Sequence, residues 1–234
     1  MPSSTNSTND VHADLLLTET LRANTKELYH VPLQPLDCSF GLVTSRGEAE
    51  PLHDVIVKQC QSQKADVAIL FAVRRPGCAS CREHGEQLSH LAALQPHKGS
   101  RHGAIALIGV IKERVHDEGI LEFHEHYYKY PLYLDEKWKI FHAMGCRKLT
   151  VPEMIPTFLK SFGRYKKKRI TNKAVGNVGD HFTQGGLLIF DKKGELRYAC
   201  DEVFGAELNL DAIQSAIDSV RKRSHHHGGK HHKS

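Results

Sequence analysis

The chain has 234 residues and a formal net charge of +5; 40% of its residues are hydrophobic and 25% are charged. These values are ordinary for a globular protein of one large or two small domains. No apolar run approaches the roughly 20 residues of a membrane-spanning helix, and the first ten residues lack the apolar centre of a secretory signal. Six cysteines in a chain this long do not form a disulfide scaffold. We therefore expect a cytoplasmic protein with no membrane span.

Positive charge is concentrated in two stretches. Residues 160–173 contain seven lysines or arginines and no acidic residue, and residues 221–234 also lack Asp and Glu. Neither stretch has the regularly interleaved aromatic residues that nucleic-acid stacking requires. We interpret the first as a solvated basic loop and the second as part of a disordered tail, and we expect no nucleic-acid partner.

The polar residues 1–12 predict a disordered N-terminal tail, and residues 224–234 predict a second one rich in His and Lys. Between them, residues 13–223 are expected to fold as one domain. An N-terminal extension precedes its first central strand. It consists of an expected helix over 13–28, an edge strand over 39–44 after Pro32 and Pro35 break regularity, and a helix over 52–61.

Two continuous apolar runs, at 66–73 and 104–111, are typical of parallel strands buried on both faces of a sheet. The helical pattern between them makes a right-handed βαβ crossover. The remaining elements predict a central mixed sheet flanked by helices, in the α/β class. They are helices over 117–128 and 137–144, a strand over 131–135, an insertion at about 146–184 with helix over 154–162, a hairpin over 187–203 and a closing helix over 208–220.

The sequence Pro76-Gly77-Cys78-Ala-Ser-Cys81 lies at the end of the first apolar run and opens the crossover helix. Unpaired N–H groups and the positive end of the helix dipole favour a thiolate there. Such surroundings can lower the pKa of a cysteine into the range of about 3.5–7.5. We therefore predict that Cys78 and Cys81 are catalytic and that Pro76 and Gly77 lie at the substrate mouth.

Three arginines, Arg74, Arg75 and Arg82, add positive charge near the two thiols, and we include Arg75 among the catalytic residues. In the same helix, Arg82, Glu83, Glu86 and Gln87 are expected on the face away from the apolar positions. His84, in that helix, is expected to be a surface residue.

Other interpretations of the cysteine pair are weaker. A buried structural pair does not suit the turn that Pro76-Gly77 predicts. Zinc needs four ligands, usually from two close pairs, and the other cysteines, Cys38, Cys60, Cys146 and Cys200, stand apart from one another. His124 and His126 point apart on a helix. We therefore expect no metal site and favour a redox centre in a thioredoxin-like fold.

Several motifs in order resemble the peroxiredoxin-like 2 family, relatives of the AhpC/TSA peroxiredoxins. They are the segment from Ala72 to Glu83, Gln87-Leu-Ser-x-Leu91, Val110-Ile-Lys-Glu113, Leu134-Asp-Glu-Lys137, Gly176-Asn177 and Gln184-Gly-Gly-Leu-Leu-Ile-Phe190. The resemblance covers residues 66–205 and implies a thioredoxin fold with thiol antioxidant activity. One branch of the family reduces prostaglandin endoperoxides. In the family the Cys-x-x-Cys pair is the redox centre, which corresponds to Cys78 and Cys81.

The motif of ordinary peroxiredoxins, Pro-x-x-x-Thr/Ser-x-x-Cys, is only partly present. Pro76 and Ser80 match it, but Glu83 stands at its cysteine position. The hypothesis is therefore a thiol oxidoreductase in which Cys78 attacks an oxidant and Cys81 resolves the product, although the peroxiredoxin alignment also allows Cys81 to attack. Electrons would come from a thioredoxin or glutathione system, with no tightly bound cofactor. A redox-sensing partner protein and a protein disulfide reductase remain alternatives.

The residues Gln184, Gly185 and Gly186 stand where thioredoxins carry a cis-proline opposite the cysteine pair. Two glycines leave no side chain there. We therefore predict an open substrate mouth at these residues and a preference for small oxidants, such as organic hydroperoxides or endoperoxides, over protein disulfides.

Overall fold

The structure, a computed structural model, describes residues 19–94, 103–146, 148–171, 179–180 and 182–227. The strands are β1 (Pro32–Asp37), β2 (Thr44–Ser45), β3 (Glu50–Pro51), β4 (Ala65–Val73), β5 (Ala104–Ile111), β6 (Leu132–Leu134), β7 (Gly186–Asp191) and β8 (Leu196–Asp201). The helices are α1 (Glu19–Tyr29), α2 (Leu52–Ser62), α3 (Ala79–Ala93), α4 (Asp117–Glu122), the π-helical segment η2 (Phe123–Tyr127), α5 (Lys139–Ala143), α6 (Val151–Lys167) and α7 (Leu210–His227).

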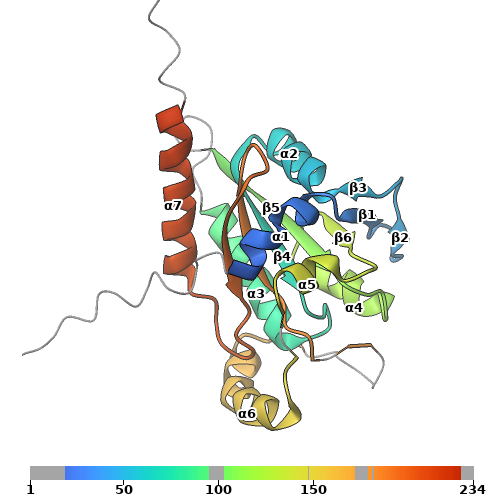
Figure 1. The fold of residues 1–234 in the computed structure, drawn as a ribbon. Coiled ribbons are helices and arrows are strands. Elements are labelled where there is room, and N and C mark those ends of the chain that lie inside the picture. Colours follow the sequence, from blue (N-terminus) through green and yellow to red (C-terminus); the bar gives the residue numbers. More distant parts are fainter. Residues whose placement is uncertain (1–18, 95–102, 147, 172–178, 181, 228–234) are drawn as a thin grey trace, which may run out of the picture.

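The strands form one mixed sheet in the order β2-β1-β6-β5-β4-β7-β8, with β3 paired to β1. Helices cover both faces of the sheet (Figure 1). Alternate residues of β4 reach the two layers: Val67, Ile69 and Phe71 pack with α3 and α7, whereas Ala68 and Leu70 pack with α1, α2 and α5. Both sets are buried, which explains the continuous apolar run in the sequence.

Strand directions bring one group of residues to a single edge of the sheet. β4 and β5 are parallel, β7 is antiparallel to β4, and β8 is antiparallel to β7. Gly186, at the start of β7, is paired with both Ala72 and Asp201. The ends of β4 and β8 therefore lie at the same edge of the sheet, on either side of the start of β7, and the residues that follow these strands can meet.

The predicted thioredoxin-like fold is confirmed. The two central strands, the crossover helix, the hairpin and the closing helix lie where the sequence indicates. Residues 1–12, and residues 228–234 of the second predicted tail, lie outside the described residues, as do Gly176 and Asn177. α7 continues past Arg223 to His227. None of the described helices combines the length and the apolar character needed to cross a membrane.

The N-terminal extension differs from the prediction. No strand covers residues 39–43, and the strand of this region is β1, which contains both Pro32 and Pro35. Proline lacks a donor but keeps its acceptor. The carbonyl of Pro35 accepts the N–H of Arg46 at 2.9 Å, and each pairing of β1 is only two residues long. The prolines therefore interrupt no long series of hydrogen bonds between strands.

The helix of the insertion is longer than predicted. α6 begins where the Glu153 carboxylate accepts the N–H of Thr150 at 2.7 Å, in a capping box. It continues through Lys167, so most of the segment interpreted as a basic loop is helical. Figure 1 shows α6 at one end of the molecule, beyond the layers that enclose the sheet.

Candidate active site

Cys78 is the N-cap of α3, with an extended backbone (φ −80°, ψ 132°). Its carbonyl accepts the N–H of Arg82 at 3.0 Å, and its own N–H donates to the carbonyl of Arg75 at 3.0 Å. Cys81 lies one turn further into the helix. Both side chains are nearly excluded from solvent, Cys78 with 9% and Cys81 with 0% exposure. The Pro76-Gly77 turn thus places Cys78 at the N-terminus of α3, where the effect of the helix dipole is strongest.

Arg74 contacts the sulfur of Cys78. Its Nη2 donates to Cys78 Sγ at 2.7 Å, and its guanidinium lies over the ring of Phe204 at 4.7 Å. Arg74 is only 3% exposed, so this charge is poorly screened by water. The side chain of Arg75 is also buried, and it lines a pocket described below.

Glu202, the first residue after β8, lies between the two thiols and their surroundings. Its Oε1 accepts from Ser80 Oγ at 3.3 Å and from Cys81 Sγ at 3.9 Å. Its Oε2 accepts the N–H of Gly185 at 3.2 Å and lies 3.7 Å from Nε of Arg74. Because Glu202 is 3% exposed, these protein groups, rather than water, solvate its carboxylate.

The two thiols are electrostatically unequal. The hydrogen bond from Cys81 and the charge of Arg74 lower the pKa of Cys78 well below its ordinary value of 9.0, although burial opposes them. Burial, the hydrogen bond to Cys78 and the charge of Glu202 raise the pKa of Cys81 well above 9.0. Both shifts favour a thiolate on Cys78 and a protonated Cys81.

A small pocket opens beside the turn that precedes Cys78. It has about 20 Å³ of free volume, which is room for about one water molecule. Its walls include Arg74, Arg75, Pro76, Gly77, Lys112 and Gly119. Pro76 and Gly77 were predicted at the substrate mouth, and the structure places both at this pocket.

The predicted open mouth at Gln184, Gly185 and Gly186 is wrong. Gln184 is 6% exposed, and both glycines are buried. A Cβ on Gly185 would lie 2.0 Å from the carbonyl oxygen of Ala72, and one on Gly186 would lie 2.5 Å from that of Cys200. The glycines are needed because neighbouring strands approach closely, and Glu202 contacts this segment through Gly185.

The polar residues of α3 also differ from the prediction. Arg82, Glu83 and His84 are all buried rather than on a solvent face. Glu83 accepts two hydrogen bonds of 2.8 Å from Arg164 and one of 2.9 Å from Lys168. These cations belong to the insertion, whose folding over α3 is not visible in the periodicity of α3 itself. Glu83, which stands at the cysteine position of the ordinary peroxiredoxin motif, therefore attaches the insertion to α3.

Arg82 and His84 each contact a backbone carbonyl and lie near a carboxylate. Arg82 donates to the carbonyl of Pro76 at 3.1 Å and to the Glu122 carboxylate at 2.9 Å, so its guanidinium supports the turn before Cys78. His84 Nε2 lies 2.7 Å from the carbonyl of Ala206, and its Nδ1 lies 3.9 Å from Glu202. Among the described residues, no group of three His, Cys, Asp or Glu side chains could hold a metal ion.

A cysteine pair at the start of a helix that follows a central strand of a thioredoxin-like fold is typical of thiol oxidoreductases. The profile of the AhpC/TSA antioxidant enzymes matches residues 90–203, which begin after the pair. Prostamide/prostaglandin F synthase of Salmo salar is 33% identical over 188 residues, which are 73% of this chain and 88% of that protein.

Peroxiredoxin-like 2A of Homo sapiens is 31% identical over 161 residues, which are 67% of this chain and 65% of that protein. A solved structure of a PrxQ variant from Xylella fastidiosa covers 85% of this chain and 92% of its own, with a TM-score of 0.47 and 10% identity. The chain belongs to the peroxiredoxin-like 2 family of AhpC/TSA-related proteins. The predicted class, a thiol oxidoreductase or peroxidase, is confirmed.

Proposed function

We propose that the protein reduces small organic hydroperoxides or endoperoxides with Cys78 as the attacking thiolate and Cys81 as the resolving thiol. The observation that supports this most directly is the 2.7 Å contact between Arg74 Nη2 and Cys78 Sγ at the start of α3. A buried cation beside a sulfur favours the thiolate, which is the nucleophile in such reactions.

The reaction uses the two thiols of the site and an external thiol reductant. With a hydroperoxide, the Cys78 thiolate attacks the terminal oxygen and breaks the O–O bond, which gives Cys78 sulfenic acid and an alcohol after the alkoxide takes up a proton. With an endoperoxide, in which both oxygens carry carbon, the same attack gives a sulfenate ester on Cys78 and an alkoxide that takes up a proton. The Cys81 sulfur then attacks the Cys78 sulfur, and the S–O bond breaks with release of water from the sulfenic acid or of the second hydroxyl group of the substrate from the ester. The product is a Cys78–Cys81 disulfide, which a thioredoxin or two glutathione molecules reduce to two thiols with two electrons.

Glu202 suits the second step. Cys81 must lose its proton to attack, and the nearest carboxylate oxygen is 3.9 Å from its sulfur. Once Cys78 is a sulfenic acid, the thiolate that held the Cys81 proton no longer exists. Glu202 then accepts this proton, and the departing hydroxide takes it up as water.

Access favours small oxidants. The pair is nearly excluded from solvent, and the pocket beside Gly77 has room for about one water molecule. A peroxide oxygen fits such a space, whereas a protein disulfide must bring two peptide segments to the sulfur. The name of the Salmo salar relative, prostamide/prostaglandin F synthase, supports the endoperoxide class. We place the protein in the cytoplasm, where these reductants are supplied.

Turnover with cumene hydroperoxide, coupled to NADPH through thioredoxin and its reductase, tests the proposal. We expect Cys78→Ser to abolish turnover and Cys81→Ser to stop after one equivalent of peroxide. Cys38→Ser, which removes a thiol outside the site, should act as wild type. Retained turnover in Cys78→Ser overturns the roles assigned to the thiols. Efficient insulin reduction by the wild type without peroxide turnover identifies a protein disulfide reductase instead.

A further inference from the structure

The outer face of α6 carries an apolar stripe. It consists of Val151, Ile155, Leu159 and Phe162, whose exposed fractions are 54, 55, 68 and 54%. Their spacing of four, four and three residues places them on one side of the helix. Large apolar side chains gathered on an exposed helix face mark an interaction surface more often than scattered ones do.

The inner face of α6 fixes the direction of this outer stripe. Ser161 and Tyr165 are buried at 1% and 4% exposure, and Tyr165 packs with Ala79 of α3. Arg164 donates to Glu83 and also to the carbonyl of Gly205 at 2.7 Å. Contacts on one side of the helix thus hold the stripe on the other side towards solvent.

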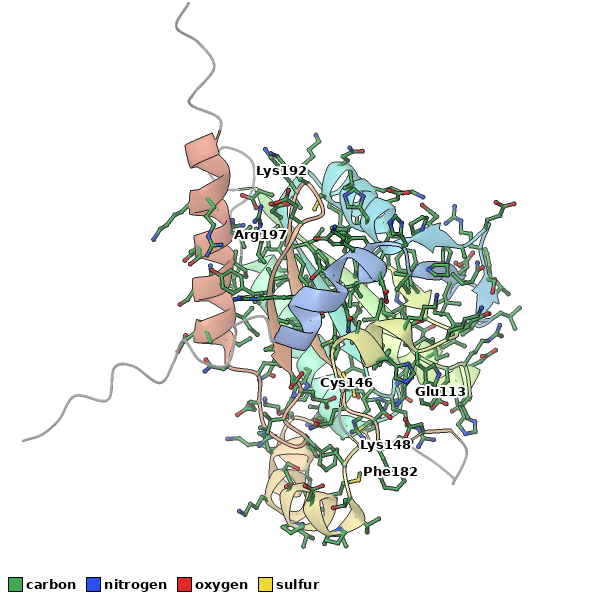
Figure 2. The ribbon with its side chains drawn as sticks, viewed as in Figure 1. Glu113, Cys146, Lys148, Phe182, Lys192 and Arg197 are labelled. Atoms are coloured by element: carbon green, nitrogen blue, oxygen red, sulfur yellow. The ribbon has the colours of Figure 1, made fainter. Side chains whose placement is uncertain are left out.

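The surroundings of the outer stripe are basic. Lys160, Lys166, Lys167 and Arg169 are exposed, and the sequence has no acidic residue between Glu153 and Asp180. At the start of the helix, the N–H of Leu149 donates to the carbonyl of Phe182, whose side chain is 37% exposed. Figure 2 shows Lys148 and Phe182 together near this end of α6.

We propose that α6 docks on an anionic membrane surface through this outer stripe. An apolar helix face rimmed with lysine and arginine is the pattern of helices that lie in the interface of a bilayer, because the apolar side chains enter the acyl boundary and the cations meet anionic headgroups. α6 has 17 residues and lies at one end of the molecule, where a flat surface reaches it without meeting the sheet layers (Figure 1).

Docking of this kind brings the thiol pair close to the membrane. Glu83, which binds Arg164 of α6 and Lys168 immediately after it, lies on the same helix as Cys81. An oxidised lipid at the surface is therefore presented near the reducing centre. The binding itself needs no turnover, so its test does not depend on the proposed reaction.

Cosedimentation of the full chain with vesicles tests the proposal. We expect binding to phosphatidylcholine vesicles that contain phosphatidylserine, weaker binding at high salt, and little binding to phosphatidylcholine alone. Leu159→Glu should abolish binding, and Lys160→Ala with Lys167→Ala should lower the partition coefficient about tenfold or more. Circular dichroism and the melting temperature establish that the variants fold.

Matched control variants change residues outside α6. Leu94 is 81% exposed outside α6, so Leu94→Glu adds the same charge elsewhere. Lys192 lies at the end of the molecule away from α6 (Figure 2), so Lys192→Ala with Lys193→Ala removes the same charge. Both controls should bind as wild type. No binding to anionic vesicles, or equal binding by Leu159→Glu, overturns the proposal. If the wild type binds no vesicles but forms a dimer, and Leu159→Glu dissociates that dimer, the stripe is a contact between two copies of the chain instead.

Discussion

Nη2 of Arg74 lies 2.7 Å from Sγ of Cys78, and both side chains are nearly excluded from water. This contact, after the hydrogen bond from Cys81, is a main reason for the lowered pKa of Cys78. We expect the rate of Cys78 alkylation by iodoacetamide to reach its half-maximum well below pH 9. In Arg74→Met the midpoint should move to higher pH, because the cation that favours the thiolate is gone.

Arg75→Met is the comparison variant, since it removes a neighbouring cation that lines the pocket and also interacts electrostatically with Cys78. Its alkylation midpoint should shift less than that of Arg74→Met, and Arg74→Lys should lie between wild type and Arg74→Met. Mass spectrometry of the modified peptide identifies the reacted sulfur. A larger shift in Arg75→Met than in Arg74→Met would make Arg75, which the sequence predicts to be catalytic, the main cation for the Cys78 thiolate.

Glu202→Gln separates the two chemical steps. The amide keeps the size of the carboxylate but does not accept the Cys81 proton. We expect sulfenic acid formation on Cys78 to remain and disulfide formation to slow by about 10²–10⁴-fold, the usual contribution of a positioned base. A sulfenic-acid trap such as dimedone, with stopped-flow timing, measures both steps.

Glu195→Gln removes a carboxylate from an ion pair with Arg197 outside the site and should leave both rates unchanged. Because Glu202 also contacts Arg74, the Cys78 alkylation profile of Glu202→Gln must be measured alongside. Equal slowing of both steps would make Glu202 a structural support for Arg74 rather than a proton acceptor.

The sequence predicts the strand, the helix and the cysteine pair because each depends on a local pattern. The run over 66–73 requires burial on both faces, and Pro76-Gly77 forces a turn immediately before the pair. Glu202 has no comparable signal. It follows Cys81 by more than a hundred residues, and only the pairing of β8 with β7, and of β7 with β4, brings it to the thiols.

The predicted solvent face of α3 fails for a related reason. Helical periodicity separates polar from apolar positions, but it does not tell whether another part of the chain covers the polar ones. Glu83 is a polar residue with 0% exposure because the insertion supplies Arg164 and Lys168. A basic run and a buried acid, far apart in sequence, are complementary only once the fold is known.

The ion pairs of Glu83 make the attachment of α6 sensitive to pH. Burial alone would raise the pKa of Glu83, but the hydrogen bonds from Arg164 and Lys168 outweigh it and hold the pKa below the ordinary 4.5. A carboxyl with a lowered pKa in the folded state stabilises the fold above its unfolded pKa, and this stabilisation is lost as pH falls through the folded value.

We therefore expect Glu83→Gln to lower stability by about 1–3 kcal/mol at pH 7, since the remaining hydrogen bonds are neutral on one side and the two cations are partly solvated. The difference in melting temperature from wild type should shrink as pH falls below about 4.3. Glu118→Gln, a carboxyl outside these ion pairs, is the control. A difference that stays constant with pH would contradict a charged Glu83 anchor.

Gly185 and Gly163 give opposite expectations for the same change to alanine. At Gly185 a Cβ would lie 2.0 Å from the carbonyl oxygen of Ala72, which is backbone and does not move aside easily. We expect Gly185→Ala to lower stability by about 1–3 kcal/mol, the usual cost of overpacking. Its N–H and carbonyl both bind Glu202, so disulfide formation should slow as well.

At Gly163, inside α6, a Cβ meets nothing within 4 Å, and alanine should stabilise the helix by about 0.5–1 kcal/mol. Urea unfolding of both variants and the stopped-flow assay of the second step measure these effects. If Gly185→Ala is as stable and as active as Gly163→Ala, the strands are not in close contact here, and the open mouth predicted from the two glycines is correct after all.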